Sequence, residues 1–112
     1  MLRFSSTVDD ITFEKIQNGQ KSVKFYLCDE KRSKLSVNDT FCLLNKNNER
    51  LYLVVKNIEI SKNLNTLIAK FSLKELGESD YNIAYSNVKQ WFSDTEIEKY
   101  SLMAVSLEIV NE

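Results

Sequence analysis

The sequence contains no histidine and no proline, and only two glycines and two cysteines among its 112 residues. Without histidine there can be no Ser-His-Asp triad, no Cys-His dyad, no histidine-ligated zinc and no imidazole acid or base. Any catalysis must therefore use lysine, carboxylate, hydroxyl, tyrosine or thiol groups. The scarcity of glycine and proline, together with 43% hydrophobic residues, excludes collagen-like and disordered chains and predicts a buried core.

The two cysteines, Cys28 and Cys42, are too few for a four-thiolate zinc site or a disulfide framework. We expect free thiols in or near strands, with Cys42 in the core between Phe41 and Leu43. The opening of the chain lacks the apolar run of a signal peptide, and no apolar run approaches the ~20 residues that span a bilayer. The sequence thus predicts a single domain over residues 1–112 in the reducing cytoplasm, with no metal, no cofactor and no membrane contact.

The net charge of −1 hides an uneven distribution of charge along the chain. Residues 1–74 carry 13 Lys or Arg against 8 Asp or Glu, whereas residues 75–112 carry 2 against 8. The densest basic stretch, residues 15–34, has six basic and two acidic side chains and could hold phosphates. A solvated lysine-rich face would explain the same pattern. The acidic second half argues against wrapping a long duplex but allows a small cationic cleft with an acidic rim.

Periodicity and turn residues predict an α+β domain with a curved, mostly antiparallel sheet. Strands are expected at residues 1–8, 22–28, 40–44, 50–61 and 103–109, and the first of them lies at an edge of the sheet. Helices are expected at residues 10–18, 64–71, 81–92 and 93–100, with a short turn at 72–77. Gly19 and Gly77 fall at helix ends, where a left-handed residue is common.

Residues 22–28 alternate between apolar and polar side chains. The apolar face comprises Val23, Phe25 and Leu27, and the polar face Ser22, Lys24, Tyr26 and Cys28. This alternation predicts a strand with one core face and one polar face. In residues 81–92 the aromatic side chains, Trp91 among them, recur at helical spacing, which predicts that they pack into the core.

Several short runs of the sequence follow one another in an order that is similar to that of a known domain family. Residues 13–23 give an apolar helix, then Gly19 and a lysine, Lys21, that enters a strand. Later runs are Asp29-Glu30-Lys31-Arg32 with Leu35, Val37-Asn38-Asp39-Thr40-Phe41, Leu76-Gly77, and Trp91-Phe92-Ser93 with Glu96. Over nearly the whole chain this order resembles the ASCH domain, a member of the PUA-like superfamily, in its small bacterial or phage single-domain form. The resemblance implies a PUA-like pseudo-β-barrel with helices that flank a cleft.

The sequence departs from the family's usual pattern at three positions. That pattern has a glutamate three residues after the lysine and an arginine five residues after it, where this sequence has Lys24 and Tyr26. The change to Lys24 reverses a charge and makes the implied cleft more cationic. Asn38 stands in place of the glycine of a Gly-Asp turn. Since asparagine tolerates the left-handed conformation better than other non-glycine residues, we expect the turn to survive.

The resemblance implies a small RNA- or nucleotide-binding module whose ligand is single-stranded RNA or a modified nucleoside. Basic side chains can neutralise phosphates, and a tyrosine ring can stack on an unpaired base. The expected binding residues are Lys21, Lys24, Tyr26, Lys31 and Arg32. The alternative is structural: Tyr26 would pack within the sheet, and Lys31 and Arg32 would pair with the neighbouring acids on a surface turn.

Two other functions remain as alternatives. Some small bacterial ASCH proteins that this chain resembles in size are amidohydrolases of N4-acetylcytidine, which use a lysine, a threonine three residues on and a distal glutamate. A lysine of lowered pKa can deprotonate a hydroxyl nucleophile. Lys21 matches the lysine and Glu75 loosely matches the glutamate, but Lys24 stands at the threonine position and has no hydroxyl. The last alternative is a protein-interaction domain whose contact surface is the acidic second half.

Overall fold

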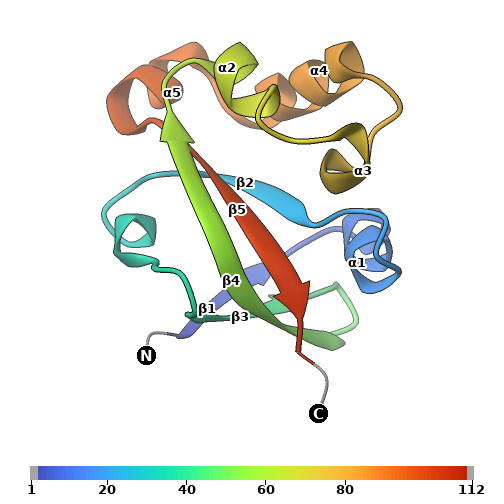
Figure 1. Cartoon of the computed structure of the whole chain (residues 1–112). Coiled ribbons are helices and arrows are strands. Elements are labelled where there is room, and N and C mark those ends of the chain that lie inside the picture. Colours follow the sequence, from blue (N-terminus) through green and yellow to red (C-terminus); the bar gives the residue numbers. More distant parts are fainter. Residues whose placement is uncertain (1–2, 111–112) are drawn as a thin grey trace.

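The computed structural model describes residues 3–110 and shows a curled sheet with helices around it (Figure 1). The elements are β1 (Arg3–Thr7), α1 (Asp10–Gln17), β2 (Val23–Leu27), the 3-10 turn η1 (Arg32–Lys34), β3 (Thr40–Leu44), β4 (Arg50–Ser61), α2 (Leu64–Ile68), α3 (Leu73–Leu76), α4 (Tyr81–Trp91), α5 (Asp94–Tyr100) and β5 (Leu102–Ile109). Every predicted strand and helix is present. The helix predicted to reach residue 71 ends earlier, at Ile68, and the first two residues of the predicted first strand lie outside the described part.

The strands form one sheet in the order β1-β3-β4-β5-β2. The pair β1–β3 is parallel, and the other three pairs are antiparallel. A bulge between Val55 and Asn57 shifts the register of the long β4–β5 pair, which increases the local twist. In Figure 1, α2, α4 and α5 gather on one side of the curled sheet, and α1 lies below α3. The predicted α+β pseudo-barrel with a mostly antiparallel sheet and β1 at an edge is therefore confirmed.

Two hydrophobic clusters pack against opposite faces of β2 and β5. The first cluster, which also takes in Phe13 and Ile16 of α1, contains Tyr26, Phe41, Leu43, Leu53, Val55, Met103 and Val105. The second lies under the helical layer and contains Val23, Phe25, Leu67, Ile68, Leu76, Ala84, Val88, Ile97, Leu102 and Ala104. Because the sheet curls and α1 closes over it, the face of β2 that was predicted to be polar places Tyr26 in the first cluster, while Ser22, Lys24 and Cys28 are half-buried. That prediction was wrong for Tyr26, which is 5% exposed.

The connection into β3 confirms one prediction and corrects another. Asn38 adopts φ 79°, so the turn keeps its left-handed residue without a glycine. Its N–H donates to the Val55 carbonyl at 2.8 Å, which ties the turn to β4. Both cysteines are free, as predicted. However, Cys42 is only half-buried, because the side chains of β3 alternate and those of Phe41 and Leu43 occupy the core side.

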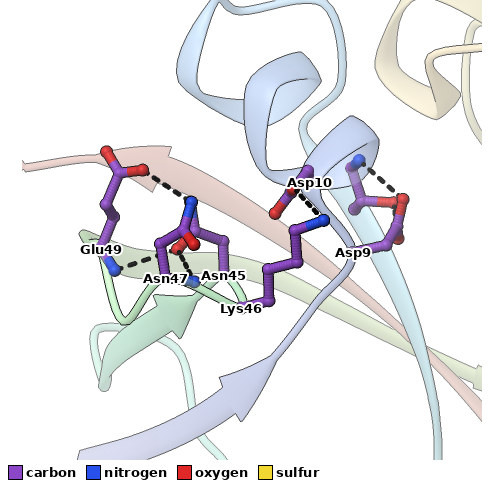
Figure 2. Close-up of polar contacts among 7 residues, drawn as sticks. Asp9, Asp10, Asn45, Lys46, Asn47 and Glu49 are labelled. Atoms are coloured by element: carbon purple, nitrogen blue, oxygen red, sulfur yellow. Dashed lines mark hydrogen bonds and ion pairs between the residues drawn. The ribbon is translucent and has the colours of Figure 1, made fainter.

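The start of α1 is tied to the β3–β4 turn (Figure 2). Nζ of Lys46 in that turn lies 3.3 Å from Oδ2 of Asp10, the first residue of the helix. The turn itself is braced by the buried Asn45, whose side-chain oxygen accepts the N–H groups of Asn47 and Glu49 at 3.0 Å each. This exposed ion pair links the turn to α1, and one side of α1 borders the site described next.

Candidate functional site

A cleft of about 580 Å³ lies between α1, β2 and the C-terminal end of α4. Its charged lining residues are Asp9, Lys15, Lys21 and Lys24, and its other polar or large apolar ones include Ile11, Thr12, Asn87, Gln90 and Trp91. Two lysines predicted to bind a ligand, Lys21 and Lys24, therefore lie in one cleft. Lys15 joins them from α1, at the first position of the basic stretch noted in the sequence.

The ammonium groups of two cleft lysines are held by consecutive backbone carbonyls at the C-terminal end of α3. Lys21 Nζ donates to the Leu76 carbonyl at 2.8 Å, and Lys15 Nζ donates to the Gly77 carbonyl at 3.0 Å. Gly77 has φ +71°, and a Cβ added there would lie 2.8 Å from the Cβ of Lys21. A glycine is therefore required both by the backbone conformation and by the close approach of the lysine stem.

Burial and mutual repulsion shift the titration of the lysines. Burial lowers the pKa of Lys21 to about 8; the charge of Lys24 adds to this effect, and that of Glu78 opposes it. Burial also lowers the pKa of Lys24, although the charge of Asp9 opposes the shift. A lysine that is less hydrated and close to other cations gains more than a solvated one from contact with an anion. The cleft is therefore suited to a negatively charged ligand.

Asp9 is the carboxylate that lines the cleft, and its side chain forms hydrogen bonds at the start of α1 (Figure 2). It caps the helix by accepting the Thr12 N–H at 3.1 Å, and it also accepts the Thr12 hydroxyl at 2.6 Å. Burial alone would raise the pKa of Asp9, but the hydrogen bonds from the side chain and backbone of Thr12 lower it overall. Asp9 thus stays ionised and offsets one of the three lysine charges.

Trp91 borders the cleft with 72% of its surface exposed. The prediction that this aromatic side chain packs into the core was wrong. The buried stripe of α4 is formed by Ala84 and Val88, and Trp91 stands at the last residue of the helix, beyond that stripe. On the facing helix α1, Ile11 also lines the cleft and is 68% exposed. The cleft therefore combines half-buried cations with exposed apolar side chains at its rim.

Tyr26 does not offer its ring to the cleft. The ring lies 5.6 Å from the Phe41 ring, centroid to centroid, inside the first core cluster. Lys24 Nζ and Arg32 Cζ lie 5.1 and 4.7 Å from its centroid. Burial raises the pKa of the phenol to about 12, and the neighbouring Ser6 and Arg32 counteract this only in part. The position of Tyr26 matches the structural alternative, a sheet residue within the core.

The remaining basic residues that the sequence singled out lie outside the lining of the cleft. Lys31 is exposed and directly precedes η1. Arg32 pairs with Asp29, with 3.5 Å between Nη1 and Oδ2, and its backbone N–H donates to the same carboxylate at 2.8 Å. This is the surface turn of the structural alternative. Arg32 still contributes positive potential, since its charge adds to the lowering of the pKa of Lys24.

Glu75, the candidate glutamate of the hydrolase alternative, serves α3 instead. Its carboxylate accepts the Ser72 N–H at 2.9 Å in a capping box, and the residue is exposed outside the cleft lining. The acids that act on Lys21 are Glu78, which is bound to the amide of Asn87, and Asp9. The two residues that the sequence offered for that alternative, Lys21 and Glu75, therefore do not line the same cleft.

Sequence reasoning missed Lys15, Asp9 and Trp91 as site residues. Lys15 lies within the basic stretch. It comes close to Lys21 because the chain turns back at Gly19, and the six-residue spacing alone does not indicate this. Trp91 could have been identified from its place at the end of a helix. In residues 3–110, no group of three His, Cys, Asp or Glu side chains could hold a metal ion. Across the same residues, no helix is long and apolar enough to cross a membrane.

Comparisons with known proteins identify the fold. No protein-family model matches the sequence, and no curated protein matches it. Among solved structures, the hypothetical protein PH0355 has a TM-score of 0.82 at 19% identity, with 97% of this chain and all of that chain covered. Protein PF0455 from Pyrococcus furiosus has a TM-score of 0.74 at 18% identity, with 99% of this chain and all of that chain covered.

A third structure carries the family name. It is the ASCH domain from Lactobacillus crispatus, with a TM-score of 0.67 at 13% identity, and the match covers 96% of this chain and 79% of that one. At these identities the likeness concerns the fold, and it agrees with the resemblance noted in the sequence. The chain therefore has the fold of an ASCH domain.

Proposed function

We propose that this chain is a nucleic-acid-binding module whose cleft takes single-stranded RNA or a nucleotide. The observation that carries the proposal is that Lys21, Lys24 and the exposed Trp91 line one cleft. Lysine ammonium groups neutralise phosphates, and an indole stacks on an unpaired base for about 1–3 kcal/mol. The likeness to an ASCH domain supplies the fold on which such a site stands. The two free thiols fit a reducing compartment such as the cytoplasm.

Single-stranded RNA suits this cleft better than a duplex does. A duplex is held by a long cationic surface or by an element that enters a groove. Here the basic side chains that line the cleft are confined to Lys15, Lys21 and Lys24, and acidic residues predominate from Glu75 onward. Unpaired bases can also reach the ring of Trp91, whereas bases within a duplex are already stacked.

The test is a titration of the protein against a fluorescein-labelled single-stranded RNA of mixed sequence, followed by fluorescence anisotropy at 50 and 200 mM salt. We expect binding that weakens steeply with salt, since counterions are released from the RNA. Lys24→Glu should lower the affinity at least tenfold. Lys34→Glu is the matched control, because Lys34 is exposed and outside the cleft lining, and it should change the affinity by less than about twofold. Absent or salt-independent binding would overturn the proposal.

A further inference from the structure

We propose that the cleft recognises a terminal phosphate monoester, on the end of an RNA strand or on a free nucleotide, in preference to the internal diesters of a strand. The inference rests on the proposed function and adds the class of ligand to it. It is drawn from the depth of the lysines, the charge of the cleft lining and the position of the apolar rim.

Because the lysines are half-buried, they favour a phosphate that projects from the end of a strand or from a free nucleotide. The Lys15 and Lys21 ammonium groups are drawn inward onto the carbonyls of Gly77 and Leu76, and all three cleft lysines are half-buried. An ammonium has three donor hydrogens, so the carbonyl contact leaves donors for a ligand. A terminal phosphate has one ester substituent and can enter such a site, whereas an internal phosphate is flanked by two sugars that meet the walls first.

The charge of the lining matches a doubly charged group. Among the charged residues that line the cleft, Lys15, Lys21 and Lys24 stand against the single carboxylate of Asp9. A phosphate monoester carries between about −1.5 and −2 at pH 7, whereas each internal diester carries one charge. Two charged groups outside the lining act on these lysines in opposite directions: the charge of Glu78 raises the pKa of Lys21, and that of Arg32 lowers the pKa of Lys24. A dianion therefore neutralises the excess charge of the lining, and a monoanion leaves part of it.

The volume and the rim fit one nucleotide attached to that phosphate. A cleft of about 580 Å³ lies within the range of small-molecule sites, about 300–1,000 Å³. Ile11 on α1 and Trp91 on α4 line the cleft and are strongly exposed, so they lie nearer its mouth than the half-buried lysines. A nucleotide whose phosphate lies among the lysines would bring its base to this apolar pair. The side-chain amide of Gln90, next to Trp91, also lines the cleft and can hydrogen-bond to a base edge.

The experiment compares the affinities of uridine pentanucleotides that differ only at their ends: both ends hydroxyl, a 5′-phosphate, or a 3′-phosphate. Uridine and its 5′-monophosphate form a second pair that distinguishes a free nucleotide from a strand end. Isothermal titration calorimetry at 100 mM salt measures each affinity. We expect at least one phosphorylated pentanucleotide to bind tenfold or more tightly than the hydroxyl form, and the monophosphate to bind more tightly than uridine.

Two variants assign the effect to the cleft. Lys21→Gln should abolish the advantage of the phosphorylated strand, whereas Trp91→Ala should weaken both strands by similar factors and keep the advantage. If all pentanucleotides bind equally in the wild-type protein, the terminal-phosphate proposal fails while the proposed function stands. If no RNA or nucleotide binds, both fail. An advantage that survives in Lys21→Gln would also overturn the proposal, because the phosphate would then be recognised elsewhere.

Discussion

Basic and aromatic side chains lie in opposite arrangements in the cleft and in the region where the connection between β2 and β3, residues 28–39, covers Tyr26 of β2. In the cleft the lysines are half-buried and the aromatic side chain, Trp91, is exposed. In the connection the basic residue Lys31 is exposed, and Arg32 covers the buried ring of Tyr26. The cleft lies toward the start of β2 and the connection follows its end, and the two regions meet at the Tyr26 ring, which Lys24 and Arg32 both approach.

The difference shows why a dense basic stretch is a weak guide to a binding site. Lys21 is bound to a backbone carbonyl and less hydrated, so it loses little freedom and little solvation when an anion binds. Lys31 is exposed and would have to be immobilised. Arg32 already has a carboxylate partner in Asp29. Exposed charges of this kind contribute about 0–1 kcal/mol per contact.

The largest expected contrast concerns the two aromatic side chains. Tyr26→Ala should lower the free energy of unfolding by about 3–5 kcal/mol, because it empties a space in the core beside Phe41. Trp91→Ala should change it by about 0.5 kcal/mol or less, since the side chain is 72% exposed. RNA affinity should nevertheless fall about tenfold in Trp91→Ala through lost stacking. Urea denaturation and anisotropy measure the two effects.

Trp91→Phe is the control for this contrast, because a smaller ring retains part of the stacking, and its affinity should lie between those of the wild-type protein and Trp91→Ala. Unchanged RNA binding in Trp91→Ala would remove Trp91 from the site. A loss of stability in Trp91→Ala as large as that in Tyr26→Ala would show that the two regions do not differ as described.

Most of the fold could be predicted from the sequence. Strand alternation, the capping boxes at Ser72 and Ser93 and the glycines at helix ends define the elements, and the structure has them close to the predicted bounds. Local patterns cannot show that a second hydrophobic layer covers the other face of β2. That layer depends on the curl of the sheet and on α1, which are contacts between residues distant in sequence. The predicted polar face therefore failed at Tyr26.

Only part of the site could be predicted from the sequence, because the rest also depends on contacts between residues distant in sequence. Lys21 lies just before β2 and Lys24 lies within it, so their proximity follows from the sequence alone. The contacts of Lys15 and Lys21 with residues 76 and 77 span more than 50 positions and depend on how α3 meets α1. Glu75 matched a family pattern by spacing, but the capping box with Ser72 uses its carboxylate.

The next contrast uses the two glycines. Gly19→Ala should cost about 1 kcal/mol of stability, because its φ is +76° but no atom lies within 4 Å of the new Cβ. Gly77→Ala should cost more, about 2 kcal/mol, because the new Cβ would also collide with the stem of Lys21. Gly77→Ala should weaken RNA binding as well, whereas Gly19→Ala should not. Urea denaturation and anisotropy test both, and equal effects in the two variants would contradict the role given to Gly77.

The smallest expected effect is a pH dependence of RNA binding that arises from Lys21 in the cleft. Lys21 has a pKa of about 8, below the unperturbed lysine value of 10.5. The charged groups that act on it are Lys24, Glu78, Lys15 and Asp9. As the pH rises from 7 to 9, Lys21 loses its charge, and the affinity for single-stranded RNA should fall severalfold. In Lys21→Arg the guanidinium stays charged, so the same titration should be nearly flat. A flat wild-type profile would contradict the assignment.

The fold responds to the same deprotonation in the opposite direction, which separates lost binding from unfolding. Because the pKa of Lys21 is lower in the folded chain than in the unfolded one, the unfolded chain binds more protons at pH values between about 8 and 10.5. The contribution of this group to the free energy of unfolding therefore rises with pH over that window. Urea denaturation at pH 7 and 9 should show that the wild-type protein gains stability relative to Lys21→Arg, while its RNA affinity declines. If the free energy of unfolding and the RNA affinity both fell, the loss of binding at high pH would come from destabilisation of the fold and not from the loss of one charge.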